Sequence, residues 1–217
     1  MSILSLAAFV ALSKKPNIDQ LSLELLRQFY EDHLEPFTFV FDLEDGRKIN
    51  LEFKKQEFCH LVGVQKLANS FVARKDRYKY FGSEGYKNIQ NGIITLKSLR
   101  AQTKKNFSSI KDKLVFFYLL PSIVKSPNIL LDFVAAPQGS KIECQLLAYN
   151  ANAEVYVHLG IDEDKLDGRY FPKTFFTERV TAASDGTKFI YGQKPLKVVS
   201  TQIIDRRKPV MLTVQTK

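Results

Sequence analysis

The spacing of hydrophobic residues changes along this chain, and that change restricts the possible folds more than any other feature of the sequence. Before Pro127 the hydrophobic residues recur mostly at helical spacing. After it they alternate with polar residues, which is typical of β-strands. The alternating segments are 129–134, 141–149, 154–160, 170–178 and 196–204. Because the turns between them are short, we expect neighbouring strands to run antiparallel, as a meander.

The first part of the chain contains one exception, a β-hairpin. Phenylalanines alternate with other residues over 37–43, a second strand-like segment covers 48–53, and Glu44-Asp45-Gly46 supplies the turn between them. The predicted fold class is therefore α+β, with N-terminal helices and a β-hairpin packed on a C-terminal antiparallel β-meander.

Helices are predicted on both sides of this hairpin. Segment 17–32 begins with Asn17 and Gln20 in the spacing of a capping box. Segment 55–67 is helical, with Gly63 as its weak point, and segment 106–124 is a stronger helix. Between them, residues 69–105 form short helical stretches at best.

The chain of 217 residues contains no convincing linker, so we expect one domain over 1–217. Within it, 1–36 forms a helical arm and 37–205 the core, and any seam falls near 126–127.

Positive charge is concentrated in one stretch. The net charge is +9, and residues 54–113 hold 14 Lys and Arg against 4 Asp and Glu. The rest of the chain is almost neutral, with 18 basic and 19 acidic residues. A local excess of this kind suits a phosphate-binding surface, although a solvated helical face with solubilising lysines is an equal alternative.

The N-terminal apolar run 3–12 is followed, not preceded, by Lys14 and Lys15. A secretory signal carries its charge on the other side, and the run is too short to span a membrane. We therefore expect a buried first helix or a helix-like arm, with a secretory signal as the lesser alternative. Cys59 and Cys144 stand in apolar contexts far apart in the sequence. Two such residues do not make a disulfide framework, so we expect a protein of the reducing cytoplasm. Because the apolar run is too short for a membrane span, we expect no membrane contact.

Several kinds of functional site are not indicated. The sequence has no Walker loop and no Gly-x-Gly-x-x-Gly after a strand, so a standard nucleotide site is not predicted. His33, His60 and His158 are scattered, which argues against a zinc site. We therefore predict no metal and no cofactor.

One segment combines a histidine with nearby lysines. His60 follows the second hairpin strand, inside the first turns of a predicted helix, with Lys54 and Lys55 close by in sequence. An imidazole can take a proton from a ribose 2′-hydroxyl or give one to a leaving 5′-oxygen, while lysines stabilise negative charge on phosphorus-bound oxygens. The alternative is a histidine that caps a helix or packs in the core.

Two further segments are candidates for contact with RNA. In 71–81 basic and aromatic residues interleave, so cations could hold phosphates while rings stack on unpaired bases. The candidate binding residues there are Arg74, Lys75, Arg77, Tyr78 and Lys79. The alternative is a surface loop that its aromatic residues anchor. Segment 170–179 is a strand with an internal Pro172, which indicates an edge strand or a β-bulge, and it ends at Arg179, another candidate for phosphate contact.

The histidine segment resembles a known family. Its residues read Phe53-Lys54-Lys55-x-x-Phe58-x-His60-Leu61-x-Gly63-x-x-Lys66-Leu67, with a second similar run at Tyr170-Phe171-Pro172-Lys173-Thr174-Phe175-Phe176. The first run is similar to the His-Leu-x-Gly signature of phage-associated barnase–EndoU–colicin–RelE-like nuclease domains, most closely the fourth group, and the similarity spans roughly 37–205.

The resemblance implies helices at the front and an antiparallel sheet behind. It also implies RNA cleavage without metal, through attack of the 2′-hydroxyl, with His60 as general acid or base and with Lys173 and Thr174 orienting the phosphate. It further suggests a toxin or a protein of phage–host conflict, which would require an antitoxin or inhibitor as partner.

Two rival functions fit the same residues. The chain could be a non-catalytic module that holds RNA, DNA or an acidic protein on its basic surface. It could also be a structural or inhibitory protein of a mobile element, whose charge serves an acidic protein groove.

Overall fold

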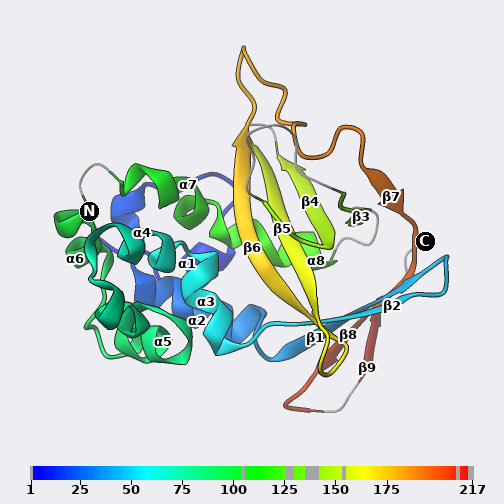
Figure 1. The fold of residues 1–217 in the computed structure, drawn as a ribbon, viewed down its shortest axis with the longest axis horizontal. Helices are drawn as coiled ribbons and strands as arrows, with labels where there is room; N and C mark the ends of the chain where they lie inside the picture. Colours follow the sequence, from blue (N-terminus) through cyan, green and yellow to red (C-terminus); the bar gives the residue numbers. More distant parts are fainter. Residues whose placement is uncertain are drawn as a thin grey trace. The chain divides into compact units, whose positions relative to one another are not determined.

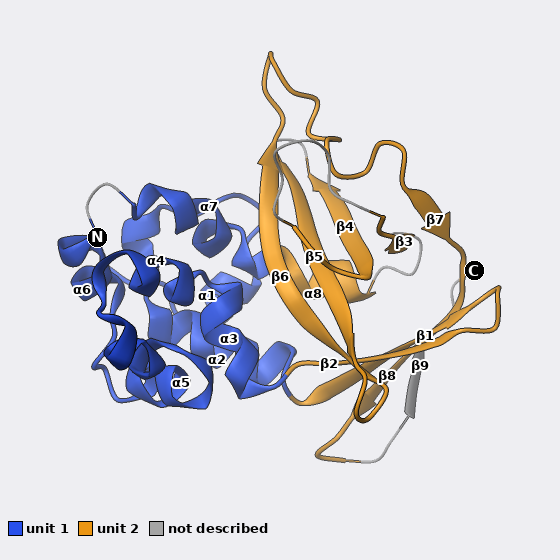
Figure 2. Cartoon of the chain, viewed as in Figure 1, with its two compact units in different colours: residues 1–35, 54–118 blue, residues 36–53, 119–217 orange. Residues whose placement is uncertain are grey.

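The computed structural model describes residues 2–103, 106–125, 130–134, 142–152, 155–208 and the backbone of 211–214. The chain divides into two compact units (Figure 2). Residues 1–35 and 54–118 form the first, called here the helical unit, and residues 36–53 and 119–217 form the second, the sheet unit. The predicted seam near 126–127 lies outside the described residues, and the expectation of a single domain stays a prediction.

The helical unit contains short helices throughout (Figure 1). In chain order they are α1 (Leu6–Val10), η1 (Ile18–Gln20), α2 (Leu23–His33), α3 (Lys55–Leu61), α4 (Val64–Phe71), η2 (Arg74–Tyr80), α5 (Gly82–Gln90), α6 (Leu96–Gln102) and α7 (Ser108–Val115). A further 3₁₀ turn, η3 (Phe117–Leu119), lies at the boundary of the two units.

Aromatic side chains form the centre of the helical unit. Phe29 and Phe58 each contact the ring of Phe117, with centroids 6.1 and 6.2 Å apart. Tyr30 lies 5.3 Å from Phe58, and Phe9 lies 5.0 Å from Phe29. These rings come from four separate helical segments, so their burial holds short helices together that would not be stable alone.

Several helix boundaries differ from the sequence-based expectations. The capping box of Asn17 and Gln20 is present, but it starts a 3₁₀ turn, and α2 begins only after Ser22, whose side chain accepts from the Leu25 N–H at 3.0 Å. The predicted buried first helix is only partly right, because α1 spans five residues and buries Phe9 alone.

The predicted helix 106–124 is interrupted at η3, and α8 (Leu120–Lys125) begins anew in the sheet unit. Pro121 cannot donate to an earlier carbonyl, which suits the first turn of a new helix.

The sheet unit contains one nine-stranded sheet within the described residues (Figure 1). Its strands are β1 (Phe37–Leu43), β2 (Lys48–Glu52), β3 (Leu130–Asp132), β4 (Leu146–Asn152), β5 (Val155–Asp164), β6 (Arg169–Arg179), β7 (Lys194–Leu196), β8 (Val198–Asp205) and β9 (Met211–Val214). Their order in the sheet is β7-β3-β4-β5-β6-β2-β1-β8-β9.

The α+β class is confirmed, and so is the hairpin, with β1 at the predicted residues. The hairpin is not a separate layer, because β1 pairs with β8 and β2 pairs with β6 in the same sheet. The pairing of β2 with β6 is parallel and involves only Leu51 and Tyr170, whereas all other described pairs are antiparallel.

A second apolar core lies within the sheet unit. It consists of Leu131, Phe133, Leu147 and Phe189. The fully buried His158 of β5 lies against it, with its ring stacked at 4.6 Å on Phe176 and edge-on at 5.8 Å to Phe189. In the described part of the chain, no helix is long and apolar enough to cross a membrane.

Candidate active site

Helix α3 presents His60 to solvent. Its side chains Phe58, Cys59 and Leu61 are fully buried, and His60 lies on the exposed side of the last helical turn. The start of the helix is fixed by Lys54, whose N–H donates to the Glu57 carboxylate and whose carbonyl accepts from the Tyr30 hydroxyl at 2.8 Å. The imidazole is therefore held on a well-anchored helix and is not packed in the core, the arrangement that proton transfer requires.

Gln65 contacts the imidazole from the next helix. Its Oε1 lies 3.1 Å from His60 Nδ1. With that oxygen as acceptor, the proton of the neutral ring sits on Nδ1, and Nε2 carries the lone pair. Gln65 thus orients the ring, a role that the sequence alone did not assign to it.

Gly63 separates α3 from α4 and allows α7 to approach closely. Its φ of 82° is left-handed, a conformation that suits glycine. A Cβ at this position would lie only 2.5 Å from Ile110 Cγ2 and 3.5 Å from Lys113 Cδ, both on α7. The glycine of the His60-Leu61-x-Gly63 run is thus explained by a turn and by helix packing.

Lys54 and Lys55 stand at the start of α3, whereas His60 lies in its last turn. Lys55 is five residues from His60, which corresponds to about 140° around a helix. Its Nζ lies 3.5 Å from the Glu31 carboxylate and 5.6 Å from the centre of the Tyr86 ring. Lys54 stands one position earlier and is half-buried. The structure therefore places Lys55 in an ion-pair network with α2 and leaves Lys54 as the better phosphate candidate of the two.

Lys113 is a candidate that the sequence analysis did not single out. Burial, reinforced by the positive charge of Lys66, lowers the pKa of Lys113 to about 8. Perturbed ionisable groups of this kind are concentrated at functional sites, although structural sites contain them too. No local pattern reveals it, since its burial depends on α7 packing against a turn 50 residues earlier in the chain.

The basic–aromatic segment forms η2 and the residues around it. Arg74 and Lys75 are exposed, and 59% of the Tyr78 surface is accessible. Arg77 donates to the carbonyls of Val72 and Asn69, so it caps the end of α4. Lys79 pairs with Asp76 at 2.8 Å. Arg74, Lys75 and Tyr78 are therefore the exposed members of this set whose side chains are not held in an ion pair within the described residues.

The remaining predicted residues lie in the sheet unit. Lys173 is the extra residue of a β-bulge, because Gly160 pairs with Thr174 while Ile161 pairs with Pro172. Its amine binds the Asp162 carboxylate at 2.5 Å. Thr174 packs its methyl group over Gly160, and Arg179 is exposed at the end of β6. His60 belongs to the other unit, and each unit is described by itself.

A second cluster of charges in the sheet unit was not predicted. Arg206 binds the Glu52 carboxylate at 3.0 Å, and Arg169 lies 3.9 Å from the same carboxylate. Asp164 and Asp167 also lie within 4 Å of Arg169. Since carboxylates outnumber the two guanidinium groups, this cluster is less suited to a phosphate than the lysines of the helical unit.

The described residues contain neither a metal-binding cluster nor a reactive thiol. Within them, no group of three or more His, Cys, Asp and Glu side chains could hold a metal ion. Burial raises the pKa of both the Cys59 and the Cys144 thiol to about 12. Neither cysteine is therefore an activated nucleophile at neutral pH.

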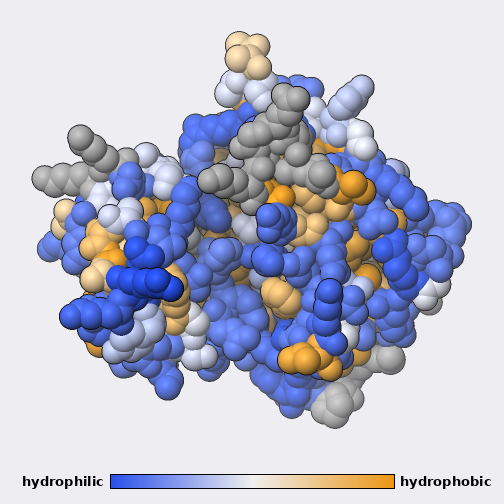
Figure 3. Space-filling model, in the orientation of Figure 1, coloured by the Kyte–Doolittle hydropathy of each residue, from blue (hydrophilic) through white to orange (hydrophobic). Residues whose placement is uncertain are grey.

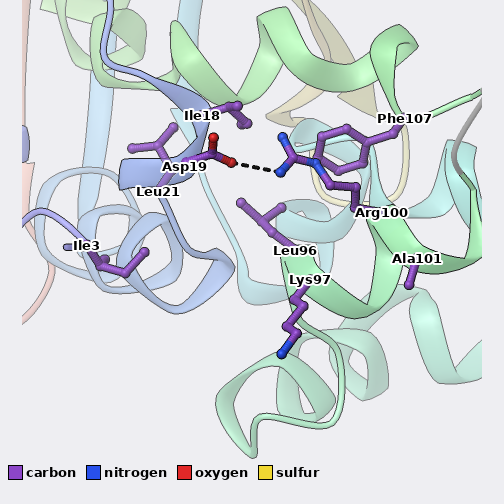
Figure 4. Close-up of a pocket in the computed structure, with 9 residues that line it drawn as sticks. All are labelled: Ile3, Ile18, Asp19, Leu21, Leu96, Lys97, Arg100, Ala101 and Phe107. Atoms are coloured by element: carbon purple, nitrogen blue, oxygen red, sulfur yellow. Dashed lines mark hydrogen bonds and ion pairs between the residues drawn. The ribbon is translucent and has the colours of Figure 1, made fainter. Parts of the chain in front are cut away.

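A mainly apolar pocket of about 530 Å³ lies in the helical unit, and His60 is not among the residues that line it (Figure 4). Asp19 and Arg100 pair across it at 2.7 Å, and the Arg100 guanidinium lies 5.3 Å from the centre of the Phe107 ring. None of its lining residues is a predicted site residue. On the face of the molecule drawn in Figure 3, most side chains are hydrophilic, and apolar side chains are visible between them.

Comparison with known proteins identifies a family. The model of the phage-Barnase-EndoU-ColicinE5/D-RelE like nuclease family, fourth group, matches residues 26–203. The match includes His60, Gly63 and Lys113 in the helical unit and β1 to β6 in the sheet unit. No curated protein and no solved structure matches the chain.

Proposed function

Because the chain belongs to the phage-Barnase-EndoU-ColicinE5/D-RelE like nuclease family, we propose that it is a metal-independent endoribonuclease. In this proposal the 2′-hydroxyl of a ribose attacks the adjacent phosphorus, and the bond from phosphorus to the 5′-oxygen breaks. The products are a 2′,3′-cyclic phosphate and a free 5′-hydroxyl. The single observation that carries the proposal is the exposed imidazole of His60 within the family's matched region.

His60 would act in proton transfer. Gln65 as acceptor at Nδ1 favours the tautomer whose Nε2 can accept the 2′-hydroxyl proton. The protonated ring can instead donate to the leaving 5′-oxygen. We assign His60 one of these two roles.

Phosphate charge would be stabilised by lysines. Lys54 is the best candidate among the predicted cations, because hydrogen bonds of its N–H and its carbonyl fix its backbone. Lys55 and Lys173 would have to leave Glu31 and Asp162 to contact a phosphate, and Thr174 would contribute a hydroxyl. The RNA strand itself would be held by Arg74, Lys75 and Tyr78, with weaker contributions from Arg77, Lys79 and Arg179.

The test is cleavage of total RNA by the purified protein in EDTA, with mapping of the new ends. We expect cleavage with 2′,3′-cyclic phosphate ends, and resistance of a substrate with a 2′-deoxy residue at the cleaved position. His60→Ala should reduce the rate by about 10²–10⁴-fold. His33→Gln, which removes another histidine of the helical unit, is the control and should retain activity.

Two results would refute the assignment. Loss of cleavage in EDTA would show that a metal is needed, and full activity of His60→Ala would place proton transfer elsewhere.

The same family relation supports a proposal about the cellular role. We propose a cytoplasmic toxin or a protein of phage–host conflict, neutralised by a protein antitoxin or inhibitor. Two separated cysteines suit a reducing compartment. Expression of the wild type in bacteria should arrest growth, whereas His60→Ala should not, and equal growth of both would argue against a toxin.

One rival function is favoured by a specific observation. Arg74 and Lys75 are exposed and have no ion-pair partner among the described residues, as in a module that only binds nucleic acid. RNA binding without any cleavage, under every condition above, would support this rival.

A further inference from the structure

A lysine from α7 lies against the turn that follows His60. The Gly63 N–H donates to the His60 carbonyl at 3.0 Å, so the turn closes directly on the catalytic candidate. Lys113 passes its aliphatic stem over this glycine, with Cδ 3.5 Å from where a Cβ would stand. Residues distant in sequence are thus brought next to the His60-Leu61-x-Gly63 run.

Lys66 lies on α4, one residue beyond the glutamine that contacts His60. Its positive charge adds to the effect of burial and lowers the pKa of the Lys113 amine further. Lys66 is exposed and Lys113 is half-buried. The two ammonium groups therefore repel one another at a site where water screens them only in part.

In the part of the chain that the structure describes, no carboxylate pairs with either lysine. Arg27, Lys79 and Arg100 of the same unit each pair with a carboxylate, whereas the exposed Arg74 and Lys75 have no such pair among the described residues. Burying an unpaired charge is costly unless a counter-charge arrives, so an anion beside the partly buried Lys113 amine would stabilise it.

We propose that Lys66 and Lys113 bind a phosphate group beside the His60 turn. A phosphate offers several acceptor oxygens to two compact ammonium groups, and lysines bind phosphate as point charges. The inference deepens the proposed function, on which it rests, by naming the cations that hold the phosphate of the substrate. The same chemistry would also accept free inorganic phosphate.

The first experiment measures binding without cleavage. A labelled single-stranded 2′-deoxyoligonucleotide lacks the attacking hydroxyl, so its affinity reports the phosphate site alone. Lys113→Met keeps the stem over Gly63 and removes the charge. We expect it to weaken binding about tenfold or more, and to reduce the slope of log affinity against log salt by about 0.7.

Matched variants separate charge from packing. Lys66→Met should behave like Lys113→Met, and Lys113→Arg should retain most of the affinity. Lys111→Met changes an exposed lysine of the same helix and should leave the affinity and the salt slope unchanged. Equal affinities of wild type, Lys113→Met and Lys66→Met would overturn the proposal.

The second experiment identifies the source of the phosphate. The Lys113 ammonium is titrated by ¹³C NMR after reductive methylation, with and without inorganic phosphate. A midpoint that rises on addition of phosphate supports the site, and it also shows that the free ion is a ligand. If the midpoint stays constant and only the oligonucleotide depends on Lys113, the ligand is the nucleic-acid phosphate.

Failure of this inference can be told apart from failure of the proposed function. His60→Ala should bind the 2′-deoxyoligonucleotide as the wild type does, while losing RNA cleavage. If no variant or wild type cleaves RNA but Lys113→Met still loses binding, the phosphate site stands and the nuclease activity falls. If cleavage depends on His60 while Lys66 and Lys113 have no effect on binding, the nuclease activity stands and the phosphate site is refuted.

Discussion

At the scale of single residues, three side chains at or beside the α3–α4 turn are the main candidates for function. His60 is exposed, Gln65 contacts its Nδ1, and Lys113 reaches the turn from α7. A local run of residues singles out His60 as a candidate but leaves its exposure open, whereas Gln65 and Lys113 become candidates only through the contacts that they make.

Replacing Gln65 by Glu should move the pH dependence of cleavage. A carboxylate against Nδ1 favours the protonated ring, because an opposite charge at hydrogen-bond distance stabilises it. We expect the pH optimum of RNA cleavage to move upward, by about one unit. The measurement is the pH–rate profile of both proteins on one oligoribonucleotide, and identical profiles would show that Gln65 does not orient the catalytic ring.

Removing the Lys113 charge should stabilise the protein at neutral pH. The folded-state pKa of about 8 lies below the ordinary value of 10.5, so the unfolded chain holds the proton more tightly. The cost is fully present below pH 8 and is relieved as pH rises through 10.5.

For Lys113→Met we expect the free energy of unfolding at pH 7 to rise by about 1–3 kcal/mol. Between pH 8 and 10.5 the gain in stability of the wild type should be absent from the variant. Urea denaturation at pH 7 and pH 10 measures both effects. A variant less stable than the wild type at pH 7 would contradict this account of the buried amine.

At the scale of elements, the break between α3 and α4 is the informative feature. The spacing of hydrophobic residues predicts one helix over 55–67, and Gly63 is its weak point. In the structure α3 ends at Leu61 and α4 begins at Val64. The break turns the chain so that Gln65 can reach back to His60, and it opens the space that Ile110 fills.

Two glycines with similar φ values allow the role of this break to be measured. Gly63 has φ +82° and no room for a Cβ, whereas Gly46 in the hairpin turn has φ +87° and nothing within 4 Å of that position. We expect Gly63→Ala to destabilise the fold by about 2–4 kcal/mol, from backbone strain and overpacking together. Gly46→Ala should cost only about 1 kcal/mol, from strain alone.

Gly63→Ala combined with Ile110→Ala should destabilise the fold by less than the sum of the two single changes, because removing the Ile110 side chain relieves the clash. Denaturation midpoints of the four proteins give the comparison. Additive effects would show that the contact between the two helices is not tight in solution.

At the scale of the whole molecule, charge and burial are divided between the two units. The helical unit contains 17 basic and 9 acidic residues, and the sheet unit contains 15 and 14. The predicted basic stretch 54–113 thus falls entirely in the helical unit. The sheet unit also buries a titratable group, His158, so its stability should depend on pH.

His158 should make global stability depend on pH in the acid range. Burial lowers its pKa to about 3, from an ordinary value of 6.5. The stabilising effect of the neutral ring is fully present above pH 6.5 and is lost as pH falls toward 3. The loss should amount to about 1.4 kcal/mol per pH unit.

His158→Phe keeps an aromatic ring against Phe176 and removes the titration. The difference in unfolding free energy between the two proteins, measured from pH 7 to pH 4, isolates this contribution from that of the carboxylates. A constant difference over that range would mean that the imidazole is protonated without cost.

The sequence by itself determined the class of the fold, the hairpin strand at 37–43 and the family to which the His60 run belongs, because these depend on local spacing of residue types. It singled out His60 but left its exposure open. It could not supply the nine-strand order, in which a hairpin from the first quarter of the chain joins strands from its end. Nor could it pair Lys113 with the His60 turn. Such contacts follow from which apolar faces pack together, and the pKa of a lysine depends on the burial that this packing creates.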